Sequence, residues 1–232
     1  MVSYLSAKLI ENDYFCDMKA DEVIFIGAGG HALSLIEFLE GNIKGYLAKE
    51  ANAEMPVAWL GDDDDASVFI EKGNKFHMAF IYSGLPLMNT RRKLLDRYEA
   101  LGAEFTTLIS PTAIVTPKSQ IEEGSSVMAG AIINRAHLGR HVVVNSGAIV
   151  EHDCVIGDNT FIGPGAVIGG FTDIGKNCFI GLGAKVGNGL KIADNVTVAM
   201  GAVVNRNLLD PGIYHGSPLK CFKLKNQELK GL

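Results

Sequence analysis

The sequence has little positive charge, few cysteines and no long apolar run, and each of these lacks excludes a class of protein. Its net charge of −5 argues against nucleic acid or an anionic membrane as the main partner, since both bind basic surfaces. No apolar run approaches the ~18 residues of a transmembrane helix. The first twenty residues contain acids and lack the basic-then-apolar layout of a signal peptide, so we expect a cytoplasmic protein.

The four cysteines show neither paired nor metal-like spacing. Cys154 and Cys178 fall on inward positions of the repeat described below, and we expect them to pack there as small apolar residues. An acidic run at residues 62–65 is the densest group of possible oxygen ligands, but acids also suit the start of a helix. No second cluster accompanies it, so we predict no metal site.

What the sequence does contain is a six-residue repeat between residues 138 and 204. Stepping by six from Leu138 lands on Leu, Ile or Val twelve times in succession, ending at Val204. The residue after each is usually glycine or alanine, and the residue four places on is small or apolar. Neither the helical period of ~3.6 nor the strand period of about 2 produces this pattern. Hexapeptide repeats are instead typical of a parallel β-helix, a stack of coils whose short strands are joined by sharp corners.

The repeat is less regular at its two ends. From Val115 to Ile133 the step of six is kept, and the phase then slips by one residue before Leu138, which predicts either a tight corner or a distorted first coil. Glycine, Asn and Asp are expected at the corners, because positive φ is costly for other residues. After Val204 the step stops, and we expect the charged segment at residues 220–230 to cap the last coil.

Ahead of the repeat, strand-like and helix-like segments alternate, which favours a small parallel α/β sheet of the Rossmann type. The last helix should be capped by Asn89, with Gly102 just beyond its end. The predicted strands are residues 23–26, 43–47, 76–82 and 105–109, and the predicted helices are residues 32–40, 66–71 and 89–101.

A glycine-rich loop, residues 27–32, joins the first strand to the first helix and fits the pattern G-x-G-x-x-A. Glycines here let a phosphate approach the free N–H groups and the positive end of the following helix. The ~85 residues ahead of the repeat are too few for a complete dinucleotide domain. We therefore predict that Gly27, Gly29, Gly30 and His31 bind a mononucleotide or the diphosphate of a nucleotide sugar. The alternative is a tight turn that binds nothing.

A second candidate site is Glu151-His152-Asp153, at one corner of the predicted β-helix. Polar side chains at a corner project away from the interior. A histidine beside a carboxylate can be held in one tautomer and act as a general base near neutral pH. The alternative is a merely exposed histidine. None of the other five histidines has a carboxylate beside it in the sequence: His31, His77, His137, His141 and His215.

These features together resemble the sugar acyltransferases, which include sialic acid O-acetyltransferases and the N-acetyltransferases of nucleotide-linked amino sugars. The resemblance covers about residues 22 to 222, and it lies in the Gly-Ala-Gly-Gly-His loop followed by a solenoid that reads Val150-Glu151-His152-Asp153-Cys154-Val155-Ile156-Gly157. It implies a left-handed β-helix, a homotrimer, acetyl-CoA in the groove between neighbouring subunits, and a nucleotide sugar on the α/β domain.

The resemblance also implies roles for single residues. His152 would take a proton from the acceptor amine or hydroxyl, and Asp153 would orient it. The backbone N–H of Gly170 would face the thioester carbonyl, and those of Leu182 and Met200 would contact the pantetheine arm. Backbone donors aimed at a developing oxyanion are the largest electrostatic contribution that such a site can make.

Three positions depart from the family pattern. Leu47 is followed by Ala48-Lys49-Glu50, where many members carry an acidic pair, and this leaves the nucleotide open. Phe161 stands where many members have a second histidine, and Ser110-Pro111 stands in place of His-Pro.

The predicted organisation is an N-terminal extension at residues 1–21, an α/β domain at 22–110, a left-handed β-helix at 111–206 and a C-terminal cap at 207–232. In the homotrimer, one flat apolar face should be buried between subunits. We expect that face to include Val143, Ile149, Val155 and Val167.

The predicted activity is acetyl-CoA-dependent N-acetylation of a nucleotide-linked amino sugar, of the 4-amino-4,6-dideoxyhexose type, in surface glycan (lipopolysaccharide or O-antigen) biosynthesis. The amine attacks the thioester directly, and an inward Cys154 is unsuited to form an acyl-enzyme. The alternatives are O-acetylation of a sugar such as a sialic acid, a non-catalytic solenoid scaffold, and a dinucleotide-binding regulatory protein.

Overall fold

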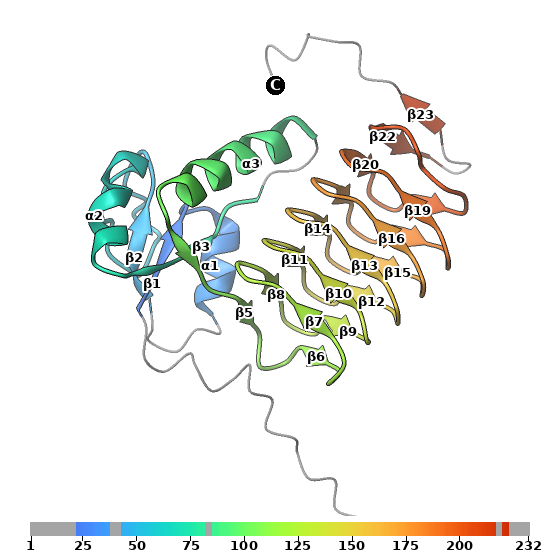
Figure 1. Cartoon of the computed structure of the whole chain (residues 1–232), viewed down its shortest axis with the longest axis horizontal. Coiled ribbons are helices and arrows are strands. Elements are labelled where there is room, and N and C mark those ends of the chain that lie inside the picture. The colour runs from blue at the N-terminus through green and yellow to red at the C-terminus, as the bar shows by residue number, and fades with distance from the viewer. Residues whose placement is uncertain (1–21, 38–42, 82–84, 217–219, 223–232) are drawn as a thin grey trace, which may run out of the picture.

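The structure, a computed structural model, describes residues 22–37, 43–81, 85–216 and 220–222. A small α/β unit lies beside a long stack of β-helical coils, and the helix α3 lies along the junction between them (Figure 1). In the part of the chain that is described, no helix is long and apolar enough to cross a membrane.

The α/β unit contains a four-stranded parallel sheet with the strand order β2-β1-β3-β4. Val23 and Phe25 pack on one face with α1, whereas Ile24 and Ile26 pack on the other with α2 and α3, as the alternation of side chains along a strand requires. The strands are β1 (Val23–Ile26), β2 (Ile43–Leu47), β3 (Lys75–Met78) and β4 (Glu104–Phe105), and the helices are α1 (Gly30–Ile36), α2 (Ala66–Glu71) and α3 (Leu85–Ala100). The predicted parallel α/β sheet is confirmed.

Several predicted boundaries were wrong. Helix α3 begins at Leu85, so Asn89 lies inside it and is no cap; Pro86 sits in the first turn, where its missing N–H costs nothing. Helix α1 starts at Gly30, and its predicted residues 38–40 lie outside the described ranges. Strand β3 ends at Met78. The predicted acidic helix start is confirmed, because Asp62 forms a capping box with Asp65.

The predicted strand at 105–109 is in fact two strands in different sheets. Phe105 pairs within the α/β sheet, whereas β5 (Leu108–Ile109) pairs with β8 in the β-helix. Between them, the Thr106 carbonyl accepts a hydrogen bond from the His77 ring at 2.9 Å. An apolar pattern shows that both segments are buried, but it does not show which sheet buries each.

The β-helix is a three-sided prism built from three parallel sheets of two- or three-residue strands, apart from its last strands. Sheet 1 contains β5, β8 (Ser126–Val127), β11 (Val143–Val144), β14 (Phe161–Ile162), β17 (Phe179–Ile180), β20 (Val196–Val198), β22 (Gly212–His215) and the antiparallel β23 (Lys220–Phe222). Sheet 2 contains β6 (Ile114–Val115), β9 (Ile132–Ile133), β12 (Ile149–Val150), β15 (Val167–Ile168), β18 (Lys185–Val186) and β21 (Val203–Val204). Sheet 3 contains β7 (Gln120–Ile121), β10 (His137–Leu138), β13 (Val155–Ile156), β16 (Asp173–Ile174) and β19 (Lys191–Ile192).

The second residue of nearly every one of these strands points into one continuous core, together with Cys154 and Cys178. The corners adopt positive φ at glycine, Asn and Asp153, as predicted, and also at Arg135, His141 and Phe171. The phase slip is a tight corner rather than a distorted coil, because His137 keeps its register with both Gln120 and Val155. The left-handed parallel β-helix is therefore confirmed.

The core continues past Val204, where the six-residue step ends. Leu208 and Tyr214 are both buried in it, and β22 extends sheet 1 by pairing with β20. Leu208 comes four residues after Val204 and Tyr214 six residues after Leu208, so a strict count of six from Val204 misses both. Most of the segment expected to cap the last coil, residues 223–230, lies outside the described residues.

The expected apolar face is not one face. Val143 lies on sheet 1, Ile149 and Val167 on sheet 2, and Val155 on sheet 3. Val143 is 1% exposed because Met88 of α3 packs over it with Phe161 and Phe179. Sheet 1 is thus covered within the chain itself. A step of six moves a residue from one sheet to the next, so residues on one face are three steps apart.

Candidate active site

The predicted catalytic pair lies at the corner between sheets 2 and 3, directly after β12. His152 Nδ1 lies 3.0 Å from Asp153 Oδ2, and Arg135, from the corner one coil earlier, holds the other Asp153 oxygen at 3.2 Å. The His152 ring packs edge-on against Phe171, with centroids 4.9 Å apart. The imidazole is therefore held on two sides while 44% of its side chain stays exposed. We call this group the His152 corner.

The charge on Asp153 decides which nitrogen of His152 can accept a proton. The hydrogen bond from His152, with the nearby Arg135 guanidinium, holds the pKa of the Asp153 carboxyl below its usual range. An ionised carboxylate accepts a hydrogen bond from Nδ1–H, which leaves the lone pair of a neutral ring on Nε2. This arrangement suits a general base that acts through Nε2.

Gly170 lies one coil above His152, and a Cβ on it would stand 2.9 Å from His152 Nε2. Within the described residues, the backbone N–H groups of Gly170, Leu182 and Met200 donate to no acceptor. Leu182 and Met200 stack one coil apart on the neighbouring corner, between sheets 1 and 2, and both side chains are exposed. The structure thus brings His152, Asp153 and Gly170 together and leaves Leu182 and Met200 across sheet 2.

A cavity of about 590 Å³ lies in the α/β unit, between the glycine loop and α3. All four residues predicted for nucleotide binding line it, namely Gly27, Gly29, Gly30 and His31. A Cβ on Gly29 or Gly30 would meet nothing within 4 Å, so these glycines leave room for a ligand. Gly27 has a structural role instead, because its φ is +100° and a Cβ would lie 2.8 Å from Phe80.

Two lysines that the sequence analysis did not assign to a site also line this cavity. Lys49 follows β2, and Lys93 projects from α3 beside Thr90 and Leu94. Neither lysine forms an ion pair with any described residue, and Asp63 is the one acid in the lining. The net positive lining suits an anionic ligand. The helical spacing of Thr90, Lys93 and Leu94 is a signal that could have placed them on one face.

His31 faces this cavity as a neutral group. Burial, with smaller contributions from His77 and Arg91, lowers the pKa of His31 to about 3. The loop itself is held from the far side, where Asn52 Nδ2 donates to the Ala28 carbonyl at 2.7 Å.

The cavity and the His152 corner lie on opposite sides of the prism. Helix α3, which walls the cavity, covers sheet 1, whereas the His152 corner is the edge where sheets 2 and 3 meet (Figure 1). In a three-sided prism that edge is opposite sheet 1. The direct path from the cavity to His152 of the same chain therefore runs through the packed core.

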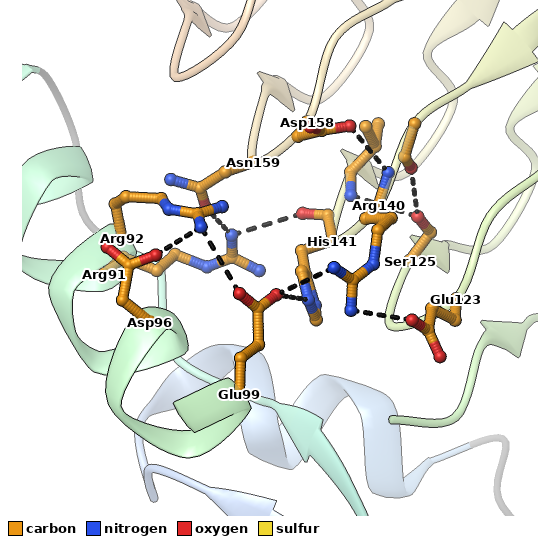
Figure 2. Close-up of polar contacts among 12 residues, drawn as sticks. Arg91, Arg92, Asp96, Glu99, Glu123, Ser125, Arg140, His141, Asp158 and Asn159 are labelled. Atoms are coloured by element: carbon orange, nitrogen blue, oxygen red, sulfur yellow. Dashed lines mark hydrogen bonds and ion pairs between the residues drawn. The ribbon is translucent and has the colours of Figure 1, made fainter. Parts of the chain in front are cut away.

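Two other histidines have carboxylate partners that come from distant parts of the sequence. His137 Nε2 lies 2.7 Å from Glu122, and His141 Nε2 lies 3.1 Å from Glu99 of α3 (Figure 2). Neither carboxylate is a neighbour in the sequence, so these two pairs are formed by the fold. Burial lowers the pKa of His141 to about 3, and its ring faces α3 rather than solvent. The spacing of one coil between Glu122 and His137 is a signal that could have revealed the first pair.

The remaining candidates for chemistry are buried. Phe161, where the family resemblance implies a second histidine, stacks on Phe179 at 4.8 Å beneath Met88. Burial raises the pKa of the Cys154 and Cys178 thiols, that of Cys178 to about 12, which leaves these two cysteines poor nucleophiles. Among the described residues, no group of three or more His, Cys, Asp or Glu could hold a metal ion.

Comparison with known proteins places this geometry in a family. Two family models match the β-helix: bacterial transferase hexapeptide (six repeats) at residues 135–170, and hexapeptide repeat of succinyl-transferase at residues 172–206. Perosamine N-acetyltransferase from Caulobacter crescentus, solved with CoA and GDP-perosamine, is 32% identical with a TM-score of 0.80, over 88% of this chain and 98% of that one. The acetyltransferase domain of PglB from Neisseria gonorrhoeae FA1090, solved with acetyl coenzyme A, is 29% identical with a TM-score of 0.79, over 87% of this chain and 98% of that one.

WeeI from Acinetobacter baumannii AYE, 20% identical with a TM-score of 0.76 over 87% of this chain and 99% of that one, shares the fold. Fold and repeat together define the class, an acyltransferase built on hexapeptide repeats. Within that class, the chain belongs to the sugar acyltransferase family that contains perosamine N-acetyltransferase.

Proposed function

We propose that this chain is an acetyl-CoA-dependent N-acetyltransferase whose acceptor is a nucleotide-linked amino sugar of the 4-amino-4,6-dideoxyhexose type. The observation that carries the proposal is the His152 corner, where an oriented imidazole, an exposed Nε2 and an unpaired backbone N–H meet beside Gly170. The relative from Caulobacter crescentus, which was solved with CoA and GDP-perosamine together, supports the choice of both substrates. Such a product belongs to the biosynthesis of a surface glycan.

The chemistry proceeds by direct transfer. The amine nitrogen attacks the thioester carbonyl carbon, and the carbonyl oxygen gains negative charge as the C–N bond forms. The Gly170 N–H stabilises that oxyanion, which is the main electrostatic contribution in acyl transfer. His152 Nε2 takes the proton lost from the amine, and Asp153 stabilises the imidazolium that results. The C–S bond then breaks, CoA leaves, and the amide remains on the sugar.

The cavity holds the nucleotide in this proposal. Backbone N–H groups of the glycine loop and the ammonium groups of Lys49 and Lys93 bind the diphosphate, and the open space above Gly29 and Gly30 admits it. Ala48-Lys49-Glu50 stands where many members of the family carry an acidic pair, and the substrate panel described below identifies the nucleotide.

The active protein in this proposal is a homotrimer. Because the cavity and the His152 corner of one chain lie on opposite sides of the prism, an acceptor in the cavity must use the corner of a neighbouring copy. Exposed apolar side chains on sheets 2 and 3 and their corners, including Val155, Phe171, Leu182 and Met200, support a second copy packing there. Closed cyclic symmetry buries such surfaces on every subunit.

The test is a substrate panel. Purified protein is incubated with acetyl-CoA and, in turn, UDP-, dTDP- and GDP-linked 4-amino-4,6-dideoxyhexoses and free sialic acid, and thiol release and product mass are recorded. An N-acetylated nucleotide sugar supports the proposal. O-acetyl sialic acid as the sole product would establish the O-acetyltransferase alternative instead, and no product from any acceptor would favour the scaffold.

A further inference from the structure

Arg91 is a fully buried arginine on α3 that no carboxylate neutralises among the described residues. Its side chain is 1% exposed, and the guanidinium contacts three separate segments of the chain, two of which, at His141 and Asn159, are seen in Figure 2. Nε donates to the Phe80 carbonyl at 3.3 Å, and Nη1 donates to the His141 carbonyl at 3.2 Å and to the side-chain oxygen of Asn159. Burial lowers the pKa of Arg91 to about 9, so the group is still charged at neutral pH.

These contacts join the wall of the cavity to the prism. Phe80 lines the cavity, whereas His141 and Asn159 occupy successive corners between sheets 3 and 1. Asn159 is in turn bonded to the next coil, because its amide donates a hydrogen bond to Asn177 on the next corner at 2.9 Å. One guanidinium is thus bonded to the α/β unit on one side and to the stacked coils on the other.

The same turn of α3 has two faces with different tasks. Thr90, Lys93 and Leu94 line the cavity, while Arg91 between them points to the prism. An arginine suits this junction because its planar fork fixes donor directions, which a lysine or an apolar residue cannot do. Met88 and Glu99 of α3 also contact the coils, but among these three side chains only Arg91 bonds to the cavity residue Phe80 as well, so it couples the cavity wall directly to the prism.

We propose that Arg91 is a positioning residue that sets the direction in which the cavity presents its bound acceptor to the His152 corner of a neighbouring copy. The inference rests on the proposed function. Arg91 lies behind the cavity wall rather than in the lining. It therefore affects where the bound acceptor is placed relative to His152 of the neighbouring copy, and not how tightly the acceptor binds. A misplacement of ~1 Å between reacting atoms costs about 10²-fold in rate, which is the expected scale of its effect.

The experiment compares Arg91→Met with Arg92→Met. Arg92 is the matched control, because it is the next residue of α3 and its described contacts are the carboxylates of Asp96 and Glu99 on the same helix. Nucleotide-sugar affinity is read from Trp59, the single tryptophan, whose Nε1 donates to the carbonyl of the cavity residue Ala48 at 2.9 Å.

For Arg91→Met we expect kcat to fall by about 10²-fold while the Kd values of the sugar nucleotide and of acetyl-CoA change by less than about threefold. Arg91→Lys should recover a small part of the loss, and Arg92→Met should keep the wild-type kcat. An unchanged kcat in Arg91→Met would overturn the inference. So would a loss of sugar-nucleotide affinity large enough to account for the lower rate, since Arg91 would then support binding.

A second variant covers the case in which Arg91→Met does not fold. Asn159 has a φ of 54°, so Asn159→Gly keeps the corner conformation while removing one anchor of the guanidinium. It should lower kcat by about tenfold with both affinities kept, and a wild-type kcat would count against the inference. Wild-type protein that acetylates no nucleotide-linked amino sugar would overturn the proposed function, and the inference with it. Active wild type with an unaffected variant would overturn the inference alone.

Discussion

At the scale of single residues, the His152 corner holds the imidazole ring in one orientation and leaves it accessible to solvent. Asp153 and Phe171 fix the ring, whereas Nε2 bonds to no described residue and faces the space beside Gly170. A positioned general base of this kind contributes about 10²–10⁴-fold to the rate. The carboxyl of Asp153 stays ionised to a pH below its usual pKa, so the orientation of the ring is maintained throughout the neutral range.

The first prediction concerns His152→Ala, which should lower kcat by roughly 10²–10⁴-fold with little change in the KM for acetyl-CoA, because proton transfer alone is lost. With an amine acceptor the deficit should shrink as the pH rises, since free amine becomes plentiful. With a hydroxyl acceptor it should stay large. Steady-state rates from pH 6 to 9 separate the two cases.

Asp153→Asn should cost less than His152→Ala, because it disturbs only orientation and imidazole charge. His137→Ala is the matched control. His137 also pairs with a carboxylate on the prism, but it lies in strand β10 of sheet 3 and not at the His152 corner. Wild-type turnover by His152→Ala at neutral pH would exclude the role of general base.

The second prediction separates two glycines of one loop. Gly29→Val places its side chain in open cavity space, so the protein should fold normally while the KM for the sugar nucleotide rises by at least about tenfold and that for acetyl-CoA stays near wild type. Gly27→Val should instead destabilise the fold, because its φ is +100° and Phe80 stands in the way. Steady-state kinetics and thermal melts measure both. If Gly29→Val raised both KM values equally, the loop would be structural.

At the scale of elements, the junction between the α/β unit and the prism buries two histidines as well as Arg91. His77 lies on β3, and His141 lies on a corner against Phe105 and Glu99; both side chains are fully buried. Burial lowers the pKa of His77 to about 4 and that of His141 to about 3. Between about pH 4 and pH 6.5, both histidines are neutral in the folded chain but would be charged in the unfolded chain.

The third prediction follows from this difference. His31 adds a third such group, because its pKa is lowered to about 3. Below pH ~6.5 the unfolded chain therefore binds about three more protons at these histidines than the folded chain does, so the free energy of unfolding is highest above that pH. It should fall by about 4 kcal/mol per pH unit on acidification towards pH 4. Urea unfolding at a series of pH values measures the slope.

His77→Asn keeps a donor for the Thr106 carbonyl and removes one of the three titrating groups, so it should reduce that slope by about a third. An identical slope in the variant would show that the histidine at position 77 titrates alike in both states.

At the scale of the whole molecule, the prism separates the two candidate sites. One side of it carries α3 and the cavity, and the opposite edge carries the His152 corner. Under the proposed function, the cavity binds the nucleotide, the corner catalyses the transfer, and a complete site needs two chains. The expectation of a homotrimer therefore has a functional reason besides the burial of apolar surface.

The fourth prediction is that light scattering at micromolar concentration gives the mass of a trimer. We also expect that activity is partly recovered when the chains of two impaired variants are assembled into mixed trimers. In trimers assembled from equal amounts of His152→Ala and Gly29→Val, about one quarter of the sites should combine an intact His152 from one copy with an intact loop from its neighbour. Turnover at low substrate concentration measures the recovery. A monomer mass, or no recovery in verified mixed trimers, would refute the shared site.

The sequence by itself determined the β-helix, its corners, the glycine loop and the pairing of His152 with Asp153. Each of these depends on residues that are close in the chain or separated by a fixed step, so the pattern contains the geometry. The slip before Leu138 was visible in the same way, although only the register of His137 shows it to be a tight corner.

The tertiary structure alone decided what covers each surface. An apolar Val143 and a buried Phe161 look like their neighbours in the repeat, and only the docking of Met88 on them distinguishes sheet 1 from the other two faces. The tertiary structure also decided that residues 105–109 are divided between two sheets. It likewise decided that Glu99 pairs with His141 and that Arg91 contacts three segments, because these contacts join parts of the chain that are far apart in the sequence. A local pattern shows that a side chain avoids water, but the contact that excludes water is made by a part of the chain that the pattern does not contain.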